Sequence, residues 1–259
     1  VVYLAQQETP VRRQVALKVI KLGMDTRQVI ARFEAERQAL AMMDHPNIAK
    51  VFDASAIGSA ESQISNPASQ IPGGRPFFVM ELVDGVPITQ YCDERQLTPK
   101  QRLELFVPVC QAIQHAHQKG IIHRDIKPTN ILVGADGEPI LLDFGIAKLL
   151  DSASSDADRT RTGRMLLTPS HAAPEQVRGT TVTTATDVYG LGALLFEMLS
   201  GKRLFGDASS ASALERAILE EPVPLPSGTT TSDAARRELR GDLDRIVQMA
   251  LRKEPERRY

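Results

Sequence analysis

The sequence is poor in cysteine, in net charge and in long apolar runs, and each shortage excludes a class of protein. Its 259 residues contain two cysteines, Cys92 and Cys110, too few for a disulfide framework and without metal-ligand spacing. We expect both to be buried thiols in a reducing compartment. The longest apolar run, 190–199, is about half a membrane span and contains Glu197. No segment is therefore expected to cross a bilayer.

The charges are balanced, which argues against partners that are bound through a general basic field. Lys and Arg number 31 against 32 Asp and Glu, for a formal net charge of -1. We therefore expect neither nucleic acid nor acidic lipid as a partner, and any polyanion must be bound locally. The hydrophobic share of 42% is enough for one large domain or for two lobes with a substantial core.

The ends of the sequence indicate a piece of a longer protein. The chain begins inside the strand-like pattern VVYLAQQ, shows no signal peptide, and stops at ERRY without a tail. A cytoplasmic location is therefore an expectation for this domain only, since a membrane anchor could lie outside the segment.

The first third of the chain is rich in strand patterns. The expected elements are a hairpin from the runs VVYLA and QVALKVIKL, a helix over 28–43, a long surface loop over 54–76, and a buried strand FFVMELV. The break DGVP that follows is a candidate hinge between a small strand-rich lobe and a larger helical one.

The rest of the chain is dominated by helical patterns. A helix is expected over 103–119, closed by Gly120 as a C-cap. Two short strands, NILV and PILLDF, are separated by the turn GADGE, and a polar, mobile segment is expected over 149–165. Apolar-faced helices are expected in DVYGLGALLFEMLSG and in DLDRIVQMALRK.

Polar side chains interrupt the apolar run IIHRDIKPTNILV, where an ordinary buried strand would leave them without partners. Asp125 and Asn130 lie five positions apart, and Asp143 opens a DFG tripeptide after the next strand. Three oxygen-bearing side chains near strand ends could hold a hard cation such as Mg²⁺. Each one alone is more often a turn residue than a ligand.

The order and spacing of VALK, HRDIKPTN, DFG and APE resemble the signature set of protein kinases over essentially the whole chain. HRDIK is similar to the Ser/Thr-specific version, and RFEAERQALAMMDHPNI and APEQVRG resemble bacterial Hanks-type kinases. The resemblance implies a two-lobed α+β fold. Its N-lobe, 1–83, would hold a small antiparallel sheet with one main helix, and its mostly helical C-lobe, 84–259, would carry the activation loop 143–175.

The resemblance also implies roles in phosphoryl transfer. Asp125 would orient the substrate hydroxyl and accept its proton, and Lys127 would neutralise charge on the γ-phosphate. Asn130 and Asp143 would be the Mg²⁺ ligands, with Mn²⁺ as an alternative metal. Such chemistry needs alignment and charge neutralisation more than covalent help.

Nucleotide recognition would fall to the first lobe and the hinge. Lys18 would contact the α- and β-phosphates and pair with Glu36, for which Glu34 is the alternative partner. The remaining ATP contacts implied by the resemblance are Met80 as gatekeeper, the backbone of Glu81 and Val83 at the adenine edge, and Val2, Ala16 and Leu132 around the ring. Apolar residues at these places are equally ordinary core.

Regulatory and structural roles follow from the same resemblance. Arg124 would meet a phosphorylated activation loop, in which Thr160 and Thr162 have the placement of autophosphorylated threonines. The residues expected to be structural are His123 stacking near Phe144, Thr168 bonded to the catalytic aspartate and lysine, Glu175 and Arg258 as a buried ion pair, and Asp187 bracing the HRD backbone.

The sequence departs from the family pattern in four places. The Gly-rich loop over the phosphates would precede Val1, so this segment is expected to bind nucleotide weakly. Leu167 stands for the usual glycine, His171 for the usual tyrosine and Gly190 for a common serine.

We predict a serine/threonine protein kinase that uses ATP and Mg²⁺, modifies protein substrates and autophosphorylates its activation loop through a transient homodimer. One alternative is a pseudokinase scaffold that keeps the fold without turnover. The other is a small-molecule phosphotransferase of the aminoglycoside type, which also pairs an aspartate with an asparagine but lacks the APE segment.

Overall fold

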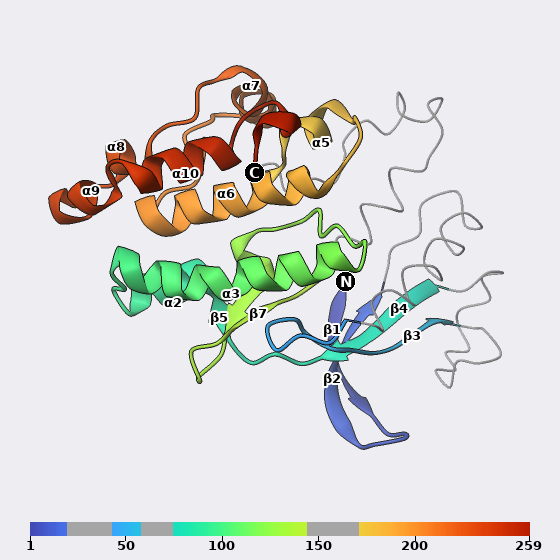
Figure 1. The fold of residues 1–259 in the computed structure, drawn as a ribbon. Coiled ribbons are helices and arrows are strands. Elements are labelled where there is room, and N and C mark those ends of the chain that lie inside the picture. Colours follow the sequence, from blue (N-terminus) through green and yellow to red (C-terminus); the bar gives the residue numbers. More distant parts are fainter. Residues whose placement is uncertain (20–42, 58–74, 144–170) are drawn as a thin grey trace. The chain divides into compact units, whose positions relative to one another are not determined.

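The computed structural model describes residues 1–19, 43–57, 75–143 and 171–259, and it divides into two compact units. The first unit contains the described residues up to Val83, and the second contains those from Asp84 onward. The first is built on a sheet and the second is mostly helical, so the chain has the mixed α+β composition expected from the sequence (Figure 1).

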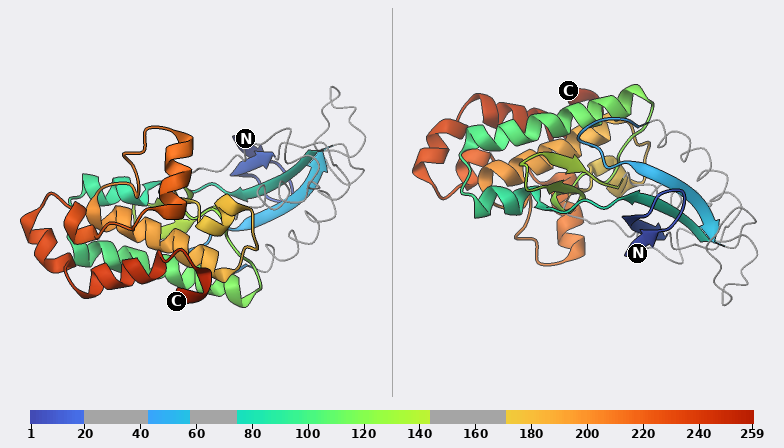
Figure 2. Two further views of the ribbon diagram at one scale, coloured as in Figure 1. Left: turned by 90° about the horizontal axis from the view of Figure 1, so that it is seen from above. Right: turned by 90° about the horizontal axis from the view of Figure 1, so that it is seen from below.

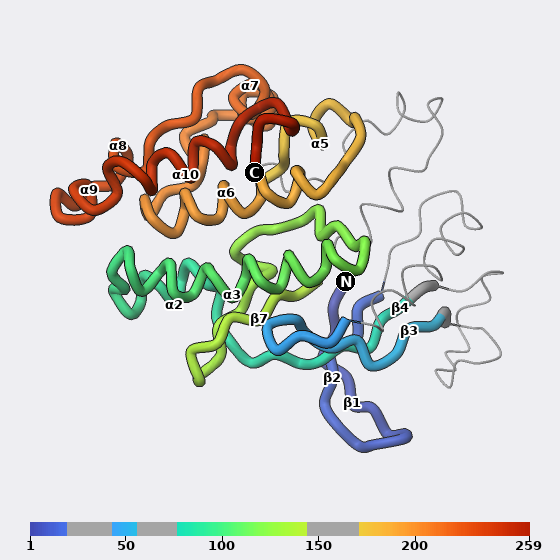
Figure 3. The backbone as a smooth tube through the Cα atoms, in the orientation of Figure 1, coloured from blue at the N-terminus to red at the C-terminus, as the bar shows by residue number. Residues whose placement is uncertain are grey.

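The first unit is a four-stranded antiparallel sheet in the order β1-β2-β4-β3. Its strands are β1 Val2–Gln7, β2 Arg13–Val19, β3 Val51–Ile57 and β4 Arg75–Glu81. The predicted hairpin is confirmed as β1 and β2, which run side by side in the tube of Figure 3. Because side chains alternate between the two faces along β2 and β4, Val15, Phe77 and Val79 lie on one face, where they form a small core.

The predicted surface loop over 54–76 is wrong at both of its ends. Ala54 to Ile57 belong to β3, and β4 already begins at Arg75, so the two strands run side by side in both views of Figure 2. Ala54 is 2% exposed and lies opposite Phe78, so a small residue fills a strand position without the large apolar side chain that signals one. The centre of that loop, and the helix expected over 28–43 except non-helical Met43, lie outside the described residues.

The second unit is organised around α6 Thr184–Ser200, which lies between α3 Pro99–Gln118 and α10 Asp242–Ala250 (Figure 1). Twelve of its 17 residues are buried, because its sequence is apolar on nearly every face. Tyr189 and Phe196 are among its core residues. The shorter helices are α2 Ile88–Glu94, α5 Pro174–Arg178, α7 Ala211–Glu220, α8 Pro226–Thr229 and α9 Asp233–Leu239, with 3-10 turns η1 Pro128–Asn130 and η3 Pro255–Arg257.

The three long helices predicted in the second unit are confirmed, with shifted ends. α3 begins at Pro99 rather than 103, because Thr98 caps it: Gln101 N–H donates to the Thr98 hydroxyl, and the Gln101 side chain accepts from Thr98 N–H. Gly120 follows its C-cap with φ +75°, a conformation that favours glycine. The TPKQ signal for this start was present in the sequence and was missed.

The predicted hairpin of short strands is confirmed as β6 Ile131–Val133 and β7 Pro139–Leu141. A two-residue strand, β5 Val86–Pro87, lies in the segment 84–87 that was interpreted as a hinge, and it pairs with β6. No helix within the described ranges combines the length and the apolar character needed to cross a membrane.

Candidate active site

The loop that carries the HRD motif has no regular secondary structure before η1. A buried carboxylate from a different part of the sequence holds its backbone. Asp187, in the first turn of α6, is 1% exposed. Its Oδ2 accepts the His123 N–H at 2.7 Å and its Oδ1 accepts the Arg124 N–H at 2.8 Å. Charge-assisted hydrogen bonds of this kind are strong, so α6 fixes the backbone two residues before Asp125. This geometry fits the bracing role expected for Asp187.

Arg124 adopts a left-handed conformation, with φ +65°, that is uncommon for a residue with a side chain. Its N–H is held by Asp187, and its carbonyl accepts from Gln176 Nε2 of α5 at 2.8 Å. Side chains from two helices thus impose the turn, which aims the next residue, Asp125. Strain of this kind persists where the surroundings over-determine the backbone, and it is common at functional sites.

His123 is fully buried and connects two backbone segments. Its Nε2 lies 3.0 Å from the Leu142 carbonyl, which can only accept, so that nitrogen carries the hydrogen. Its Nδ1 accepts the Asp125 N–H at 3.2 Å. Burial lowers the pKa of His123, against the opposite effect of Asp187 nearby. A neutral ring with both nitrogens bonded to backbone groups is suited to a structural role rather than to proton transfer.

Asp125, Lys127 and Asn130 converge at the centre of the loop. Lys127 Nζ lies 2.8 Å from Asp125 Oδ2, and Asn130 Nδ2 donates to the same oxygen at 3.0 Å and to the Asp125 carbonyl at 2.8 Å. The side chains of Asp125 and Lys127 are 17% and 19% exposed, so both can meet a ligand. The arrangement holds one carboxylate in a fixed orientation beside one cation.

The β6–β7 hairpin brings Asn130 and Asp143 to the same end of the sheet. Leu142 N–H donates to the Asn130 carbonyl at 2.7 Å, and Asp143 follows directly. The Asn130 amide nitrogen forms both of these hydrogen bonds to Asp125, so the amide oxygen is the atom that could bind a metal. No group of three His, Cys, Asp or Glu that could hold a metal occurs among the described residues. The donor set fits Mg²⁺, which takes few protein oxygens and shares phosphate oxygens.

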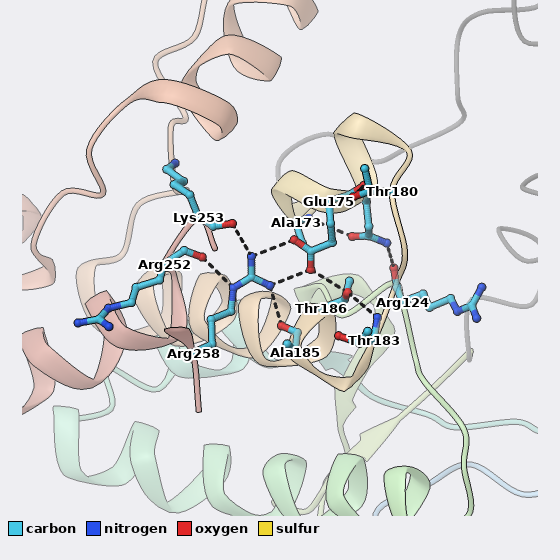
Figure 4. A network of polar contacts seen from close by, with 11 residues as sticks. Arg124, Ala173, Glu175, Thr180, Thr183, Ala185, Thr186, Arg252, Lys253 and Arg258 are labelled. Atoms are coloured by element: carbon cyan, nitrogen blue, oxygen red, sulfur yellow. Dashed lines mark hydrogen bonds and ion pairs between the residues drawn. The ribbon is translucent and has the colours of Figure 1, made fainter. Parts of the chain in front are cut away.

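Glu175 of α5 and Arg258 form a buried ion pair (Figure 4). The bond is bidentate, at 2.7 and 2.9 Å, and Thr186 Oγ1 donates to Glu175 at 2.8 Å. Burial alone would raise the pKa of Glu175, but the hydrogen bonds from Arg258, from the backbone and from Thr186 outweigh it and hold that pKa below its usual range. The expected pairing of these two residues is present, and it ties α5 to the end of the chain.

In the first unit, the sheet register places four of the expected nucleotide residues on one face. Ala16 and Lys18 lie two apart on β2, Val2 pairs with Lys18, and Met80 pairs with Ala16. Cross-strand partners share a face, as do residues two apart. Glu81 N–H donates to the Lys50 carbonyl at 2.8 Å, so only the Glu81 carbonyl would serve an adenine edge.

Two further adenine contacts were expected at the end of the first unit and in the second. Val83 follows β4, and Leu132 lies in β6, and both are half-buried. The other expected site residues lie outside the described residues: Glu36 with its alternative Glu34, Phe144, Thr160, Thr162 and Thr168.

Sequence reasoning missed two residues that support the loop. Gln176 bonds the Arg124 carbonyl, and His117 Nε2, at the end of α3, lies 2.7 Å from Asp187 Oδ2. Gln176 directly follows the APE motif, but nothing in a linear pattern indicates its contact 52 residues away. Both contacts are tertiary, so spacing along the chain carries no signal for them.

Comparison with known protein families identifies the family of this chain. The model of the protein kinase domain matches residues 1–259, the whole chain. The chain belongs to the protein kinase family. The structure places the residues expected from the family resemblance as described above: Lys18 on a strand, the anchored HRD loop, the aspartate after β7, and the Glu175–Arg258 pair.

Relatives of this kinase domain include serine/threonine-protein kinases of mycobacteria. The chain is 39% identical over 262 residues to the serine/threonine-protein kinase PknB of Mycobacterium tuberculosis, covering 100% of this chain and 38% of the relative. It is 36% identical over 262 residues to PknB of Mycolicibacterium smegmatis, with the same coverage. It is 35% identical over 249 residues to serine/threonine-protein kinase PknA of Mycobacterium tuberculosis, covering 95% of this chain and 52% of the relative. The chain thus spans about two fifths of the PknB proteins.

Proposed function

We propose that this domain transfers the γ-phosphoryl group of ATP to serine and threonine hydroxyls of proteins. The observation that carries the proposal is the anchored carboxylate of Asp125, held by Lys127 and Asn130 at the end of a backbone turn that Asp187 and Gln176 impose. Family membership and the Ser/Thr kinases among the relatives support the same reaction.

In this mechanism Asp125 accepts a hydrogen bond from the substrate hydroxyl, orients the oxygen toward phosphorus and takes its proton. Lys127, 2.8 Å from Asp125, neutralises charge on the transferred phosphoryl group. A loose transition state needs little covalent help, so alignment and electrostatic stabilisation supply most of the rate.

The oxygens of Asn130 and Asp143 would hold Mg²⁺, or Mn²⁺ in its place. When bound, the metal neutralises charge on the phosphates. The role of this chain is to hold both oxygens at one end of the β6–β7 hairpin, through the Leu142 to Asn130 hydrogen bond. Lys18 would contact the α- and β-phosphates and pair with Glu36.

Adenine would lie against the face of the sheet that carries Val2, Ala16 and Met80, and Leu132 is a further proposed contact of the ring. The carbonyl of Glu81 and the backbone of Val83 would meet its polar edge. The shared sheet face of the first three residues supports this placement.

Regulation would act through the activation loop. Phosphate on Thr160 or Thr162, added by a second copy of the domain in a transient dimer, would pair with Arg124, since a guanidinium binds phosphate well. His123, Phe144 and Thr168 would serve as structural residues around the catalytic loop.

The two cysteines support a reducing, cytoplasmic setting for this domain. Cys92 and Cys110 form no disulfide. Burial raises the pKa of Cys92 to about 11 and that of Cys110 to about 12, so both remain unreactive thiols.

Phosphate transfer from γ-labelled ATP with Mg²⁺ to a mixture of protein substrates tests the proposal. Asp143→Asn removes a proposed metal ligand, and Asp136→Asn makes the same change at an exposed position of the β6–β7 turn. We expect label on serine and threonine in the native protein and in Asp136→Asn, and none in Asp143→Asn. The assay is run on a protein extended upstream to include the Gly-rich loop, and folded, nucleotide-binding protein of this length that transfers no label would favour the scaffold alternative. Label on an aminoglycoside but never on protein would establish the small-molecule alternative.

A further inference from the structure

α6 touches the catalytic loop at a second point, through a glycine. A Cβ built on Gly190 would lie 3.0 Å from the Cβ of Ile126 and 3.7 Å from its Cγ1 and Cδ1. Two carbons in van der Waals contact lie about 3.5–4.0 Å apart. The bare backbone of the helix therefore lets Ile126 lie closer than any larger residue would allow.

The close contact involves an atom that cannot turn away. The position of a Cβ is set by its own backbone, so no rotamer change of Ile126 relieves a clash there. Ile126 is 3% exposed and lies between Asp125 and Lys127, so movement of its backbone moves both. Asp187 of the same helix holds the backbone of His123 and Arg124 in place. A displacement of Ile126 would therefore move Asp125 and Lys127 rather than the residues before them.

The helix itself has little freedom to move away. A Cβ on Gly192, two residues later, would lie 2.8 Å from the Cβ of Ala250 on α10, so α6 is in equally close contact on another side. Glycine inside a helix is disfavoured relative to alanine, so two in one buried helix call for a packing reason. Gly192 serves the contact with α10, and Gly190 serves the contact with the loop.

We propose that Gly190 is a positioning residue for phosphoryl transfer: by letting α6 approach Ile126, it sets the position of Asp125 and Lys127. This inference rests on the proposed kinase function. Gly190 touches neither substrate nor nucleotide in this account and acts only through Ile126. The Gly-for-Ser departure at this position is then part of how this chain builds its catalytic loop.

The test compares Gly190→Ala with Gly192→Ala. Both add one methyl group to buried α6 and raise its helix propensity, but only the first faces the loop. For Gly190→Ala we expect kcat to fall about tenfold, since sub-ångström misplacement of reacting groups is costly, while KM for ATP stays within about twofold. Gly192→Ala is expected to lower the unfolding midpoint and to keep kcat within about twofold. Gly190→Ser is expected to match Gly190→Ala, because it adds the same Cβ.

Amide hydrogen exchange over 123–130 gives a readout independent of activity. We expect faster exchange there in Gly190→Ala and native-like exchange in Gly192→Ala. Native kcat and exchange in Gly190→Ala would overturn the proposal, and so would equal effects of both variants. If the native protein transfers no phosphate, the proposed function fails, and the exchange comparison alone decides on positioning.

If Gly190→Ala does not fold, Ile126→Gly tests the contact from the loop side without adding an atom to α6. It removes the Cβ that would lie 3.0 Å from a Cβ built on Gly190, together with the side-chain carbons that would lie 3.7 Å from it. We expect reduced kcat with faster exchange over 123–130. Native values of both would overturn the proposal.

Discussion

Replacing Arg258 by methionine removes a guanidinium with five N–H donors, all of which have acceptors. Two go to the carboxylate of Glu175, at 2.7 and 2.9 Å. The other three go to the carbonyls of Arg252, Ala185 and Lys253, at 2.7, 2.8 and 3.2 Å. The Arg258 side chain is 0% exposed and that of Glu175 is 4% exposed, so water cannot replace these bonds.

The expected cost is large because the change leaves a buried carboxylate with fewer donors and three carbonyls without their partner. Breaking one side of a buried ion pair costs about 3–5 kcal/mol, a large share of the ~5–15 kcal/mol of a typical domain. Urea unfolding at pH 7 measures the free energy directly. Arg257→Met is the control, since Arg257 is exposed and its loss should stay within about 0.5 kcal/mol.

The pH dependence provides a second check. The pKa of Glu175 lies below its ordinary value of 4.5, so its contribution to stability is present above that value and is lost as the pH falls through the folded pKa. Without Arg258, burial raises the pKa of Glu175, and the variant takes up a proton at higher pH than the native protein does. The stability gap between native and variant should therefore narrow as the pH falls from 7 toward 5.

Three outcomes would refute this reasoning. One is a loss below about 1 kcal/mol in Arg258→Met, or a loss no larger than in Arg257→Met. Another is a gap that widens as the pH falls. The third concerns the double variant Glu175→Gln with Arg258→Met: because the two side chains contact each other, it should lose less than the sum of the single changes. A strictly additive loss would mean that they are not coupled.

Three further predictions concern the second unit. Asp125→Asn should lower kcat about 10²- to 10⁴-fold, since it removes the proposed proton acceptor and the charge beside Lys127, and a native rate in the γ-labelled ATP assay would contradict its role. Its unfolding midpoint should stay close to the native one, because the amide oxygen can still accept from Asn130. Asp187→Asn should cost about 1–3 kcal/mol in urea unfolding, because an amide NH₂ would face an N–H that the carboxylate now accepts, and a loss no larger than in Asp136→Asn would contradict it. Burial lowers the pKa of Lys253 to about 8 from 10.5, so between these values the unfolded chain holds a proton that the folded chain lacks. The stability of the native protein relative to Lys253→Met should then rise with pH, and urea midpoints that show no such rise would refute the shift.

The parts of the fold that the sequence predicted are those with a local signal. Apolar runs of helical length and pattern revealed α6 and α10, and the GADGE turn revealed the β6–β7 hairpin. The second half of β3, 54–57, escaped because Ala54, Ser55 and Ala56 are small, and because the strand forms only against β4, which lies more than 15 residues further along the chain. Small, weakly patterned residues carry no signal until their partner strand is known.

In the candidate site, too, residues of one local motif were predicted and contacts between distant residues were not. Asp125, Lys127 and Asn130 lie within six residues, so one motif names all three, and the structure places them in contact. The contacts from Gln176 and His117 span 52 and 70 residues and appear only in the folded chain. The close approach at Gly190 could not be predicted either, since the sequence shows only a missing side chain and not what fills its place.

The dependence of the HRD loop on α6 has a consequence for biosynthesis. The loop leaves the ribosome more than 60 residues before the carboxylate that shapes it, and the clamp between Glu175 and Arg258 closes over 83 residues. Contacts of such long sequence separation form slowly, and domains emerge from synthesis N-terminus first. A nascent chain that stalls before α6 would therefore contain Lys18, Asp125, Asn130 and Asp143 and still lack the contacts that impose the backbone turn before Asp125. The residues proposed to carry phosphoryl transfer would all be synthesised well before the helix that shapes their loop.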